Sequence, residues 1–320
     1  MKQQYHLSRV NMKAERAFVK TELFAPRPIA VVAHDAGGAE LLANFINRND
    51  LRQGSFAIEG PAVSIFRRVL GEFQVAALED VLQRSDWILT GTSWQSDLEW
   101  RAIRLARALG KRTVSFLDHW LNYKDRFVRL GEQCLPDELW VADRHAFQIA
   151  ERAFPGTAIK NVGNPYLEEI AERVCRQTKA FKSGQAQRVL IVTEPVSVHA
   201  FKQHGDAMHY GYTEFEAVEL MLARLPQILC GSPLERIVVR PHPSEPLNKY
   251  QYLIENSEGF PVVVRKDGDL LDEILESSIV VGCETMALIV ALAAGRRAIS
   301  CIPGAGRPCV LPHENIERWQ

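Results

Sequence analysis

The sequence predicts an α/β protein of two Rossmann-like domains, each built on a parallel sheet, with a functional site in the interdomain cleft. Three observations lead to this prediction. The chain has 320 residues, about twice the length of an average domain. Short apolar runs without alternation, which are typical of strands buried on both faces, recur in both halves of the chain. Segments with helical periodicity separate many of these runs.

The first half opens with the clearest pattern of strand, loop and helix. Residues 29–33 (IAVVA) form a continuous β-branched run, a loop with two glycines follows, and residues 41–48 have helical spacing. Further strands are expected at residues 55–58, 73–77, 87–90, 113–117 and 138–141. Helices are expected at residues 97–109, 144–153 and 166–179.

The second half repeats this alternation and predicts a doubly wound parallel sheet. Strands are expected at residues 189–193, 237–240, 262–264, 279–281 and 298–302. Helices are expected at residues 214–225, 270–277 and 285–294. Residues 194–212, with His199, His204 and His209, show no clear period and are expected to form a solvated loop or a mobile lid.

The polar segment 181–187 (FKSGQAQ) is typical of a linker and places the domain boundary between Asn164 and Gln187. The expected parts are an N-terminal domain (1–164), a crossing and linker (165–187), a C-terminal domain (188–305) and a tail (306–320). The last residues of the tail, NIERWQ, are expected to form a helix that packs back on the N-terminal domain.

Charge and composition exclude several classes of protein. The formal net charge of -1 gives no global attraction to nucleic acid or to anionic membranes. The six cysteines lack CxxC or zinc-site spacing, so we expect neither a disulfide framework nor a structural metal. The first residues lack the apolar core of a secretory signal, and the most apolar stretches are shorter than the ~20 residues of a membrane span. These features predict a cytoplasmic protein.

Polar residues follow two strands of the first half, at the edge where α/β sheets bind ligands. Gly37 and Gly38 follow the first strand and let the backbone approach a ligand, while the amides of the next helix favour an anion. Asp35 is a candidate general base there, or it caps the helix while the glycines only make the turn. Asp118 and His119 follow a later strand, as candidates for proton transfer or as parts of a structural hydrogen-bonded cluster.

In the second half, the segment RPHPSE after a strand contains Arg240, His242, Pro243 and Ser244. Two prolines stiffen the backbone around His242, and a rigid histidine next to an arginine suits a phosphate. The alternative is a proline-rich turn with an incidental histidine.

Two further loops of the second half supply candidates. Thr193 and Glu194 follow its first strand. Glu284 and Thr285 lie where a later strand leads into a helix, and the amides at that point can bind an anion. Glu284 is a candidate acceptor for ribose hydroxyls; alternatively, both residues cap the helix.

The order and spacing of VTEP, RPHPSE and VVGCETMALIVALAAGRRAISCIPG resemble the nucleotide-binding half of GT-B-fold glycosyltransferases. This pattern of the second half is most similar to bacterial transferases of surface polysaccharides, including those that use CMP-activated sialic acid-like or Kdo sugars. In those families an HP motif places a histidine on the donor phosphate, so the resemblance assigns this role to His242 with Pro243. It puts Glu284 and Thr285 in the later nucleotide-binding loop, and it aligns TEP with a QP element, with Glu194 in place of Gln. KNVGNPYLEEI resembles the interdomain crossing of GT-B enzymes and of UDP-N-acetylglucosamine 2-epimerases.

The resemblance implies glycosyl transfer without a metal or another cofactor. A nucleotide sugar would lie on the C-terminal domain, where His242 and helix amides stabilise the leaving phosphate. A glycan or glycolipid acceptor would approach from the N-terminal domain, and Asp35, or His119 with Asp118, would take its proton. A CMP-sugar is favoured over a UDP-sugar, no nucleic-acid partner is expected, and a glycolipid would bring the enzyme to a membrane surface. The alternatives are a sugar-nucleotide epimerase or hydrolase of the same fold, or a non-catalytic nucleotide-sugar-binding subunit.

Overall fold

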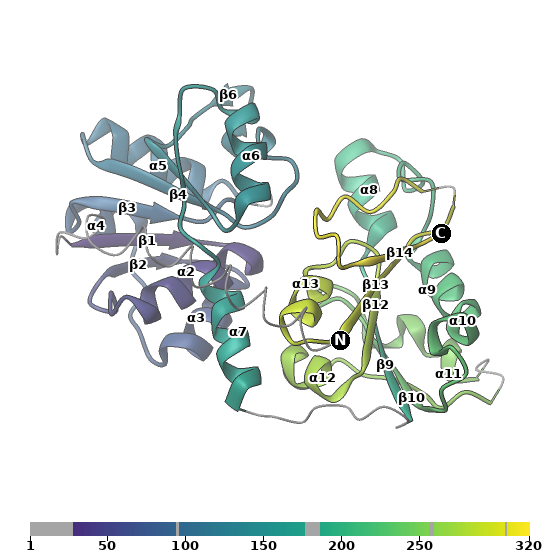
Figure 1. Ribbon diagram of the computed structural model, residues 1–320. Coiled ribbons are helices and arrows are strands. Elements are labelled where there is room, and N and C mark those ends of the chain that lie inside the picture. The colour runs from purple at the N-terminus through teal and green to yellow at the C-terminus, as the bar shows by residue number, and fades with distance from the viewer. Residues whose placement is uncertain (1–27, 94–95, 177–185, 256–258, 305) are drawn as a thin grey trace. The chain divides into compact units, whose positions relative to one another are not determined.

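The computed structural model describes residues 28–93, 96–176, 186–255, 259–304 and 306–320. The chain divides into two compact units, Met1–Glu168 and Glu169–Gln320, whose elements are labelled in Figure 1. Each unit contains a six-stranded sheet in which all strand pairs are parallel. The predicted α/β class with two Rossmann-like sheets is thereby confirmed. No helix in these ranges is long and apolar enough to cross a membrane.

The sheet of unit 1 has the strand order β2-β1-β3-β4-β7-β8. Its strands are β1 (Ile29–Ala33), β2 (Ser55–Ile58), β3 (Trp87–Thr90), β4 (Arg112–Leu117), β7 (Glu138–Val141) and β8 (Ala158–Asn161). Its helices are α2 (Ala36–Arg48), α3 (Ala62–Leu70), α4 (Leu78–Gln83), α5 (Leu98–Ala108), α6 (Arg144–Ala153) and the short 3₁₀ helix η1 (Asp125–Phe127). The helix α7 (Pro165–Arg176) begins in unit 1 and ends in unit 2.

Buried apolar side chains hold the sheet of unit 1 against its helices. Every residue of β1 and of β3 is buried, as expected for strands that are covered on both faces. Phe45 of α2 contacts Phe116 of β4 and Trp140 of β7, with ring centroids 6.4 and 5.2 Å apart. The apolar face of α2 therefore packs on the middle strands of the sheet.

A small antiparallel hairpin of β5 (Val128–Arg129) and β6 (Glu132–Gln133) projects from unit 1. Leu130 forms its tip with a φ of 51°, a left-handed conformation that is uncommon for leucine, and its side chain is fully exposed. Arg129, which pairs with Glu132 next to this tip, holds the hairpin in place by donating to the carbonyl oxygens of Ser93 and Ser96.

The sheet of unit 2 has the strand order β11-β10-β9-β12-β13-β14. Counted along the chain, this is the 3-2-1-4-5-6 order of the Rossmann fold. Its strands are β9 (Gln187–Val192), β10 (Leu234–Arg240), β11 (Val262–Val264), β12 (Ile279–Gly282), β13 (Arg297–Cys301) and β14 (Glu317–Trp319). Its helices are α8 (Val196–His204), α9 (Glu214–Ala223), α10 (Leu225–Leu229), α11 (Tyr252–Glu255), α12 (Leu270–Glu276), α13 (Met286–Ala293) and the short η2 (Leu247–Tyr250).

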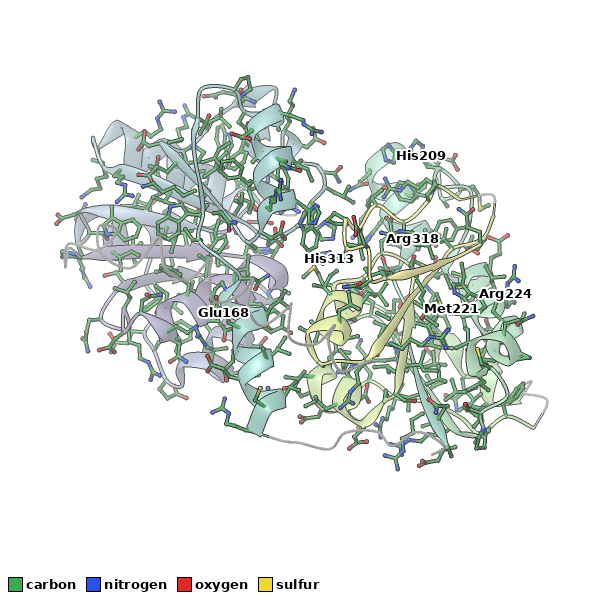
Figure 2. All side chains as sticks on the ribbon, viewed as in Figure 1. Glu168, His209, Met221, Arg224, His313 and Arg318 are labelled. Atoms are coloured by element: carbon green, nitrogen blue, oxygen red, sulfur yellow. The ribbon has the colours of Figure 1, made fainter. Side chains whose placement is uncertain are left out.

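The tail differs from the helix that the sequence predicted. Residues 317–319 form β14, which pairs in parallel with β13 and so belongs to the sheet of unit 2. Arg297 of β13 holds this strand by two hydrogen bonds to the carboxylate of Glu317, at 2.6 and 2.7 Å. Arg318 donates to the carbonyl oxygen of His313, and Arg224 donates to that of the last residue. Arg318, His313 and Arg224 are labelled in Figure 2. These contacts hold the end of the chain in an extended conformation. The segment NIERWQ is too short for its own periodicity to predict this.

Two further predictions are wrong. Residues 73–77 form only an isolated bridge between Val75 and Phe56 instead of a strand. Residues 196–204 form α8 instead of a loop, and the helix ends at Gly205 in the left-handed conformation. This helix buries only Val196 and Ala200, so it has a weak apolar pattern. Most of the predicted linker, residues 181–185, lies outside the described ranges.

Candidate functional site

The candidate residues gather at the carboxyl ends of the strands in each unit. Ligands of open α/β sheets bind near the switch point, where the chain connections leave the first strand in opposite directions. In unit 1 this point lies between β1 and β3, and in unit 2 it lies between β9 and β12. The two groups of residues belong to different units, and a site shared by both units stays a prediction.

In unit 1 the structure brings Asp118 against the glycines of the first loop. A Cβ atom on Gly37 would clash with Oδ2 of Asp118, so only glycine fits there without a shift. A Cβ on Gly38 would lie 3.4 Å from Cα of Gly91 in the loop after β3. The helix start that was expected to attract a ligand anion therefore has a carboxylate of the protein beside it.

Arg126 neutralises this carboxylate. It forms an ion pair with Asp118, and it also donates to the carbonyl oxygen and to Oγ1 of Thr92, both at 2.9 Å. Sequence reasoning missed Arg126, which lies 34 residues from Thr92 in a segment without a motif. Because of this pairing, Asp118 is better placed to hold the loops together than to accept a proton.

Asp35 does not cap α2 with its side chain, although it occupies the N-cap position. Instead, its Oδ1 lies 2.7 Å from Nδ1 of His34, and both side chains are partly exposed. A carboxylate on Nδ1 fixes the orientation of an imidazole ring. The first loop thus presents a His34–Asp35 pair, of which only Asp35 was predicted.

Glu99 is a buried carboxyl group directly behind this pair. Its side chain comes from the first turn of α5, is 3% exposed, and accepts the backbone N–H of His34 at 2.8 Å. Its other oxygen, Oε2, has no hydrogen-bond partner among the described residues. Burial raises the pKa of Glu99 to about 7. Sequence reasoning missed Glu99, although its position between the buried Leu98 and Trp100 is a signal that it faces the sheet.

His119 lies close to an aromatic neighbour. Its ring packs edge-on against Trp120, with centroids 5.4 Å apart, and the indole N–H of Trp120 donates to the carboxylate of Asp143. The two alternatives for His119, proton transfer and a structural hydrogen-bonded cluster, both stay predictions.

In unit 2 the local contacts fix the tautomer of His242. The backbone N–H of Ser244 lies 3.2 Å from Nδ1 of His242, and this N–H can only donate. Nδ1 is therefore an acceptor, and the neutral ring carries its proton on Nε2. Burial lowers the pKa of His242, and the nearby His199 lowers it further, so the ring is neutral at pH 7. A neutral ring with an Nε2–H group is a hydrogen-bond donor for a ligand oxygen.

The loop that carries His242 is held by Glu245, which the sequence did not single out. One oxygen of the buried Glu245 accepts the backbone N–H of His242 at 2.9 Å and the hydroxyl of Thr193. The other accepts from Lys249 and from Tyr250, each at 2.8 Å. Burial would raise the pKa of Glu245, but these hydrogen bonds outweigh burial and hold it below the ordinary value.

Several predicted ligand residues of unit 2 make contacts within the protein. Arg240 pairs with Glu273 at 2.9 Å and donates to two carbonyl oxygens of the loop before α12. The carbonyl oxygen of Pro243 accepts from Lys266 at 2.6 Å. The hydroxyl of Thr285 caps α13 by accepting from Ala287. These contacts fix the loops at the strand ends.

Glu194 occupies the switch point itself. Its Oε1 accepts the backbone N–H groups of Cys283 and Glu284, at 3.2 and 2.8 Å, at the start of α13. Burial and the neighbouring Glu284 raise the pKa of Glu194 to about 7, against the effect of these amides. The carboxylate of Glu284 points elsewhere, because it accepts from Arg307 and from the backbone N–H of Val310, both at 2.9 Å.

His199 is a further candidate that the predicted loop concealed. It lies on α8, and its ring packs edge-on against that of His242, with centroids 6.1 Å apart. Burial lowers the pKa of His199 too. Two neutral imidazoles thus lie together beside the end of β10. Among the described residues, no group of three or more His, Cys, Asp or Glu side chains is arranged to hold a metal ion.

No protein-family model matches the sequence, and no curated protein is significantly similar to it. Solved structures do resemble the fold. The UDP-GlcNAc 2-epimerase of Methanocaldococcus jannaschii aligns with a TM-score of 0.56 at 11% identity, over 85% of this chain and 83% of that one. S. aureus MnaA in a structure with UDP gives 0.57 at 10% identity, over 86% and 79%. The Neisseria meningitidis UDP-GlcNAc 2-epimerase bound to UDP-GlcNAc gives 0.54 at 11%, over 85% and 82%. At such identities the likeness shows the fold alone, and the chain has the GT-B fold of two Rossmann-like units.

Proposed function

We propose that this protein is an enzyme that breaks the bond between the sugar and the phosphate of a nucleotide sugar, and that it is a glycosyltransferase. The observation that carries the proposal is the tautomer of His242, whose neutral ring offers Nε2–H to a phosphate oxygen. Such a donor stabilises negative charge that develops on the leaving phosphate. The resemblance of RPHPSE to the HP motif of GT-B transferases supports the same role.

The acceptor would be activated in unit 1. Asp35 is the expected general base, and its contact with His34 lets the two side chains share the proton that leaves the acceptor hydroxyl. Asp118 is engaged by Arg126, so we assign it a positioning role. His119 is retained as the alternative base. The acceptor would be a glycan or a glycolipid, and the latter would bring the enzyme to a membrane surface.

A specific observation favours a second candidate, a sugar-nucleotide epimerase. The structures of M. jannaschii and N. meningitidis that share the fold are both UDP-GlcNAc 2-epimerases, and the latter holds UDP-GlcNAc. For this reason UDP-sugars stand beside the CMP-sugars that the HP resemblance favours. The two candidates differ in one respect: an epimerase needs no acceptor.

The first experiment is a thermal-shift series with CMP, CDP, UDP, GDP and ADP. A ligand at a hundredfold excess over its Kd stabilises the folded state by about 2.7 kcal/mol, which gives a clear shift in Tm. Stabilisation by CMP or by UDP selects the donors for the turnover assays. The absence of a shift with all five nucleotides would refute the proposal.

Turnover assays then separate the candidates. The selected nucleotide sugar is incubated alone and with a panel of acceptors, and products are followed by NMR. Conversion of the donor alone to a second sugar nucleotide supports the epimerase. Release of the nucleotide only with an acceptor supports the transferase. Binding without turnover under either condition would identify a non-catalytic binding subunit.

Two variants test the assigned residues. His242→Ala should weaken nucleotide binding by about tenfold or more, since it removes a donor to a charged group, whereas His209→Ala, at an exposed position of the same unit, should leave it unchanged. Asp35→Asn should leave nucleotide binding near normal and abolish turnover. Unchanged affinity in the first variant, or full activity in the Asp35 variant, would remove that residue from the mechanism.

A further inference from the structure

The carboxyl group of Glu194 lies at the switch point of the unit 2 sheet, the edge at which Rossmann-like sheets bind ligands. Its Oε1 accepts the backbone N–H groups of Cys283 and Glu284, in the loop between β12 and α13. This loop follows β12, which is next to β9 in the sheet, so Glu194 spans the switch point from the loop of the neighbouring strand. A ligand phosphate at this edge has to bind beside this carboxyl group or displace it.

The surroundings of Glu194 make a second negative charge unfavourable there. Among the described residues, no lysine, arginine or histidine forms an ion pair with Glu194. The charged neighbour is Glu284, whose own counter-ion is Arg307. Tyr212 and the thiol of Cys283 also face the carboxyl group, and burial raises the pKa of both, so they are uncharged. Among the described residues, the backbone amides of the loop before α13 are thus the favourable partners for the charge of Glu194.

We propose that a ligand phosphate binds at the start of α13 together with one proton, which Glu194 takes up from solvent. In the bound state Oε1 keeps its two amide bonds, and Oε2–H donates to a phosphate oxygen. The carboxylate becomes a carboxylic acid, so the bound phosphate meets a neutral donor instead of a like charge. This role rests on the proposed function, since it concerns the same nucleotide site.

A glutamine at this position imitates the protonated side chain. In Glu194→Gln the amide oxygen can accept the two helix amides, and the amide nitrogen can donate to the phosphate, at every pH. Glu194→Ala removes both the charge and the donor. With the pKa of Glu194 raised to about 7, the proton is already present on part of the molecules at neutral pH and on fewer of them at pH 8.

The test is calorimetric titration with UDP, CMP and CDP at pH 6, 7 and 8, in two buffers of different ionisation enthalpy, which counts the protons taken up on binding. At pH 8 the natural protein should take up about one proton more than Glu194→Gln. Its Kd should weaken by about fivefold between pH 7 and pH 8, because the protonated fraction of a group with a pKa of about 7 falls by this factor, while the Kd of Glu194→Gln changes much less. Glu194→Ala should bind more weakly than Glu194→Gln, and the exposed-site control Glu219→Gln should behave as the natural protein does.

The possible results are distinguishable. Equal proton uptake in the natural protein and Glu194→Gln would overturn the inference while leaving the nucleotide site intact. If Glu194→Gln and Glu194→Ala both bind the nucleotide more tightly than the natural protein does, and to the same extent, the inference is also overturned. The phosphate would then displace the side chain of Glu194 instead of accepting a hydrogen bond from it. If no variant and no natural protein binds UDP, CMP or CDP at any pH, the proposed function itself fails, and this inference fails with it.

Discussion

Replacing Glu99 by glutamine should make the stability of unit 1 less dependent on pH. In the folded chain Glu99 keeps its proton up to a pKa of about 7, whereas the ordinary value is 4.5. Between these values the folded state binds more protons than the unfolded state, so its free energy of unfolding falls as pH rises through this window. At about 1.4 kcal/mol per pKa unit, the window is worth about 3 kcal/mol. Glu99→Gln does not titrate and should escape this loss.

The assay is denaturant unfolding at several values between pH 5 and pH 8, followed by tryptophan fluorescence. Five of the six tryptophans precede the boundary between the units, so this signal reports mainly on unit 1. They are Trp87, Trp94, Trp100, Trp120 and Trp140. The side-chain amide introduced by Glu99→Gln is buried without an acceptor, which adds a cost that does not vary with pH. The test therefore follows how the difference in free energy of unfolding between the variant and the natural protein changes with pH.

The difference in free energy of unfolding, Glu99→Gln minus the natural protein, should rise by about 3 kcal/mol from pH 5 to pH 8. Glu151→Gln, at an exposed position of α6, is the matched control and should show a constant difference. A constant difference for Glu99→Gln as well would refute the reasoning, because it would mean that Glu99 titrates alike in the folded and unfolded chains.

Further predictions concern packing and charge. Gly37→Ala should destabilise unit 1 by about 1–3 kcal/mol in denaturant unfolding, because the added Cβ meets the carboxylate of Asp118. Gly38→Ala, the control, should cost less. Equal costs for the two variants would contradict the close approach of Gly37 to Asp118. Lys249→Met leaves Glu214 and Glu245 buried without their cation, so unit 2 should lose about 3–5 kcal/mol at pH 7 by circular dichroism. Ionisation of these glutamates stabilises the natural protein above their ordinary pKa, so the deficit should shrink as pH falls towards 4; a deficit that is constant with pH would refute this explanation.

The sequence predicted the parts of the fold that depend on local pattern. The buried runs at β1 and β9 have no alternation, and such runs indicate parallel strands covered on both faces. Because parallel strands end at one edge, the residues that follow them, such as Asp35 and His242, were expected near a site. β14 was missed because its three residues are fixed by partners elsewhere, above all Arg297.

The parts of the candidate site that were missed come from outside the loops that follow the strands. Arg126 reaches Thr92 and Asp118 from η1, and Glu99 reaches the backbone of His34 from a helix 65 residues further along the chain. Their importance comes from burial and from the groups that they meet, and neither is visible in a local pattern. The tautomer of His242 could not be predicted from the sequence either, because it depends on where the backbone N–H of Ser244 lies.

The hairpin of unit 1 offers a way to follow its candidate site by proteolysis. Leu130 at the tip is fully exposed, and exposed tips are preferred cleavage sites. Arg126 lies four residues before this tip, and its contacts with Thr92 and Asp118 oppose the opening that a protease needs. A ligand that tightens these loops should therefore slow cleavage at the tip, so the rate of nicking would report occupancy without any label.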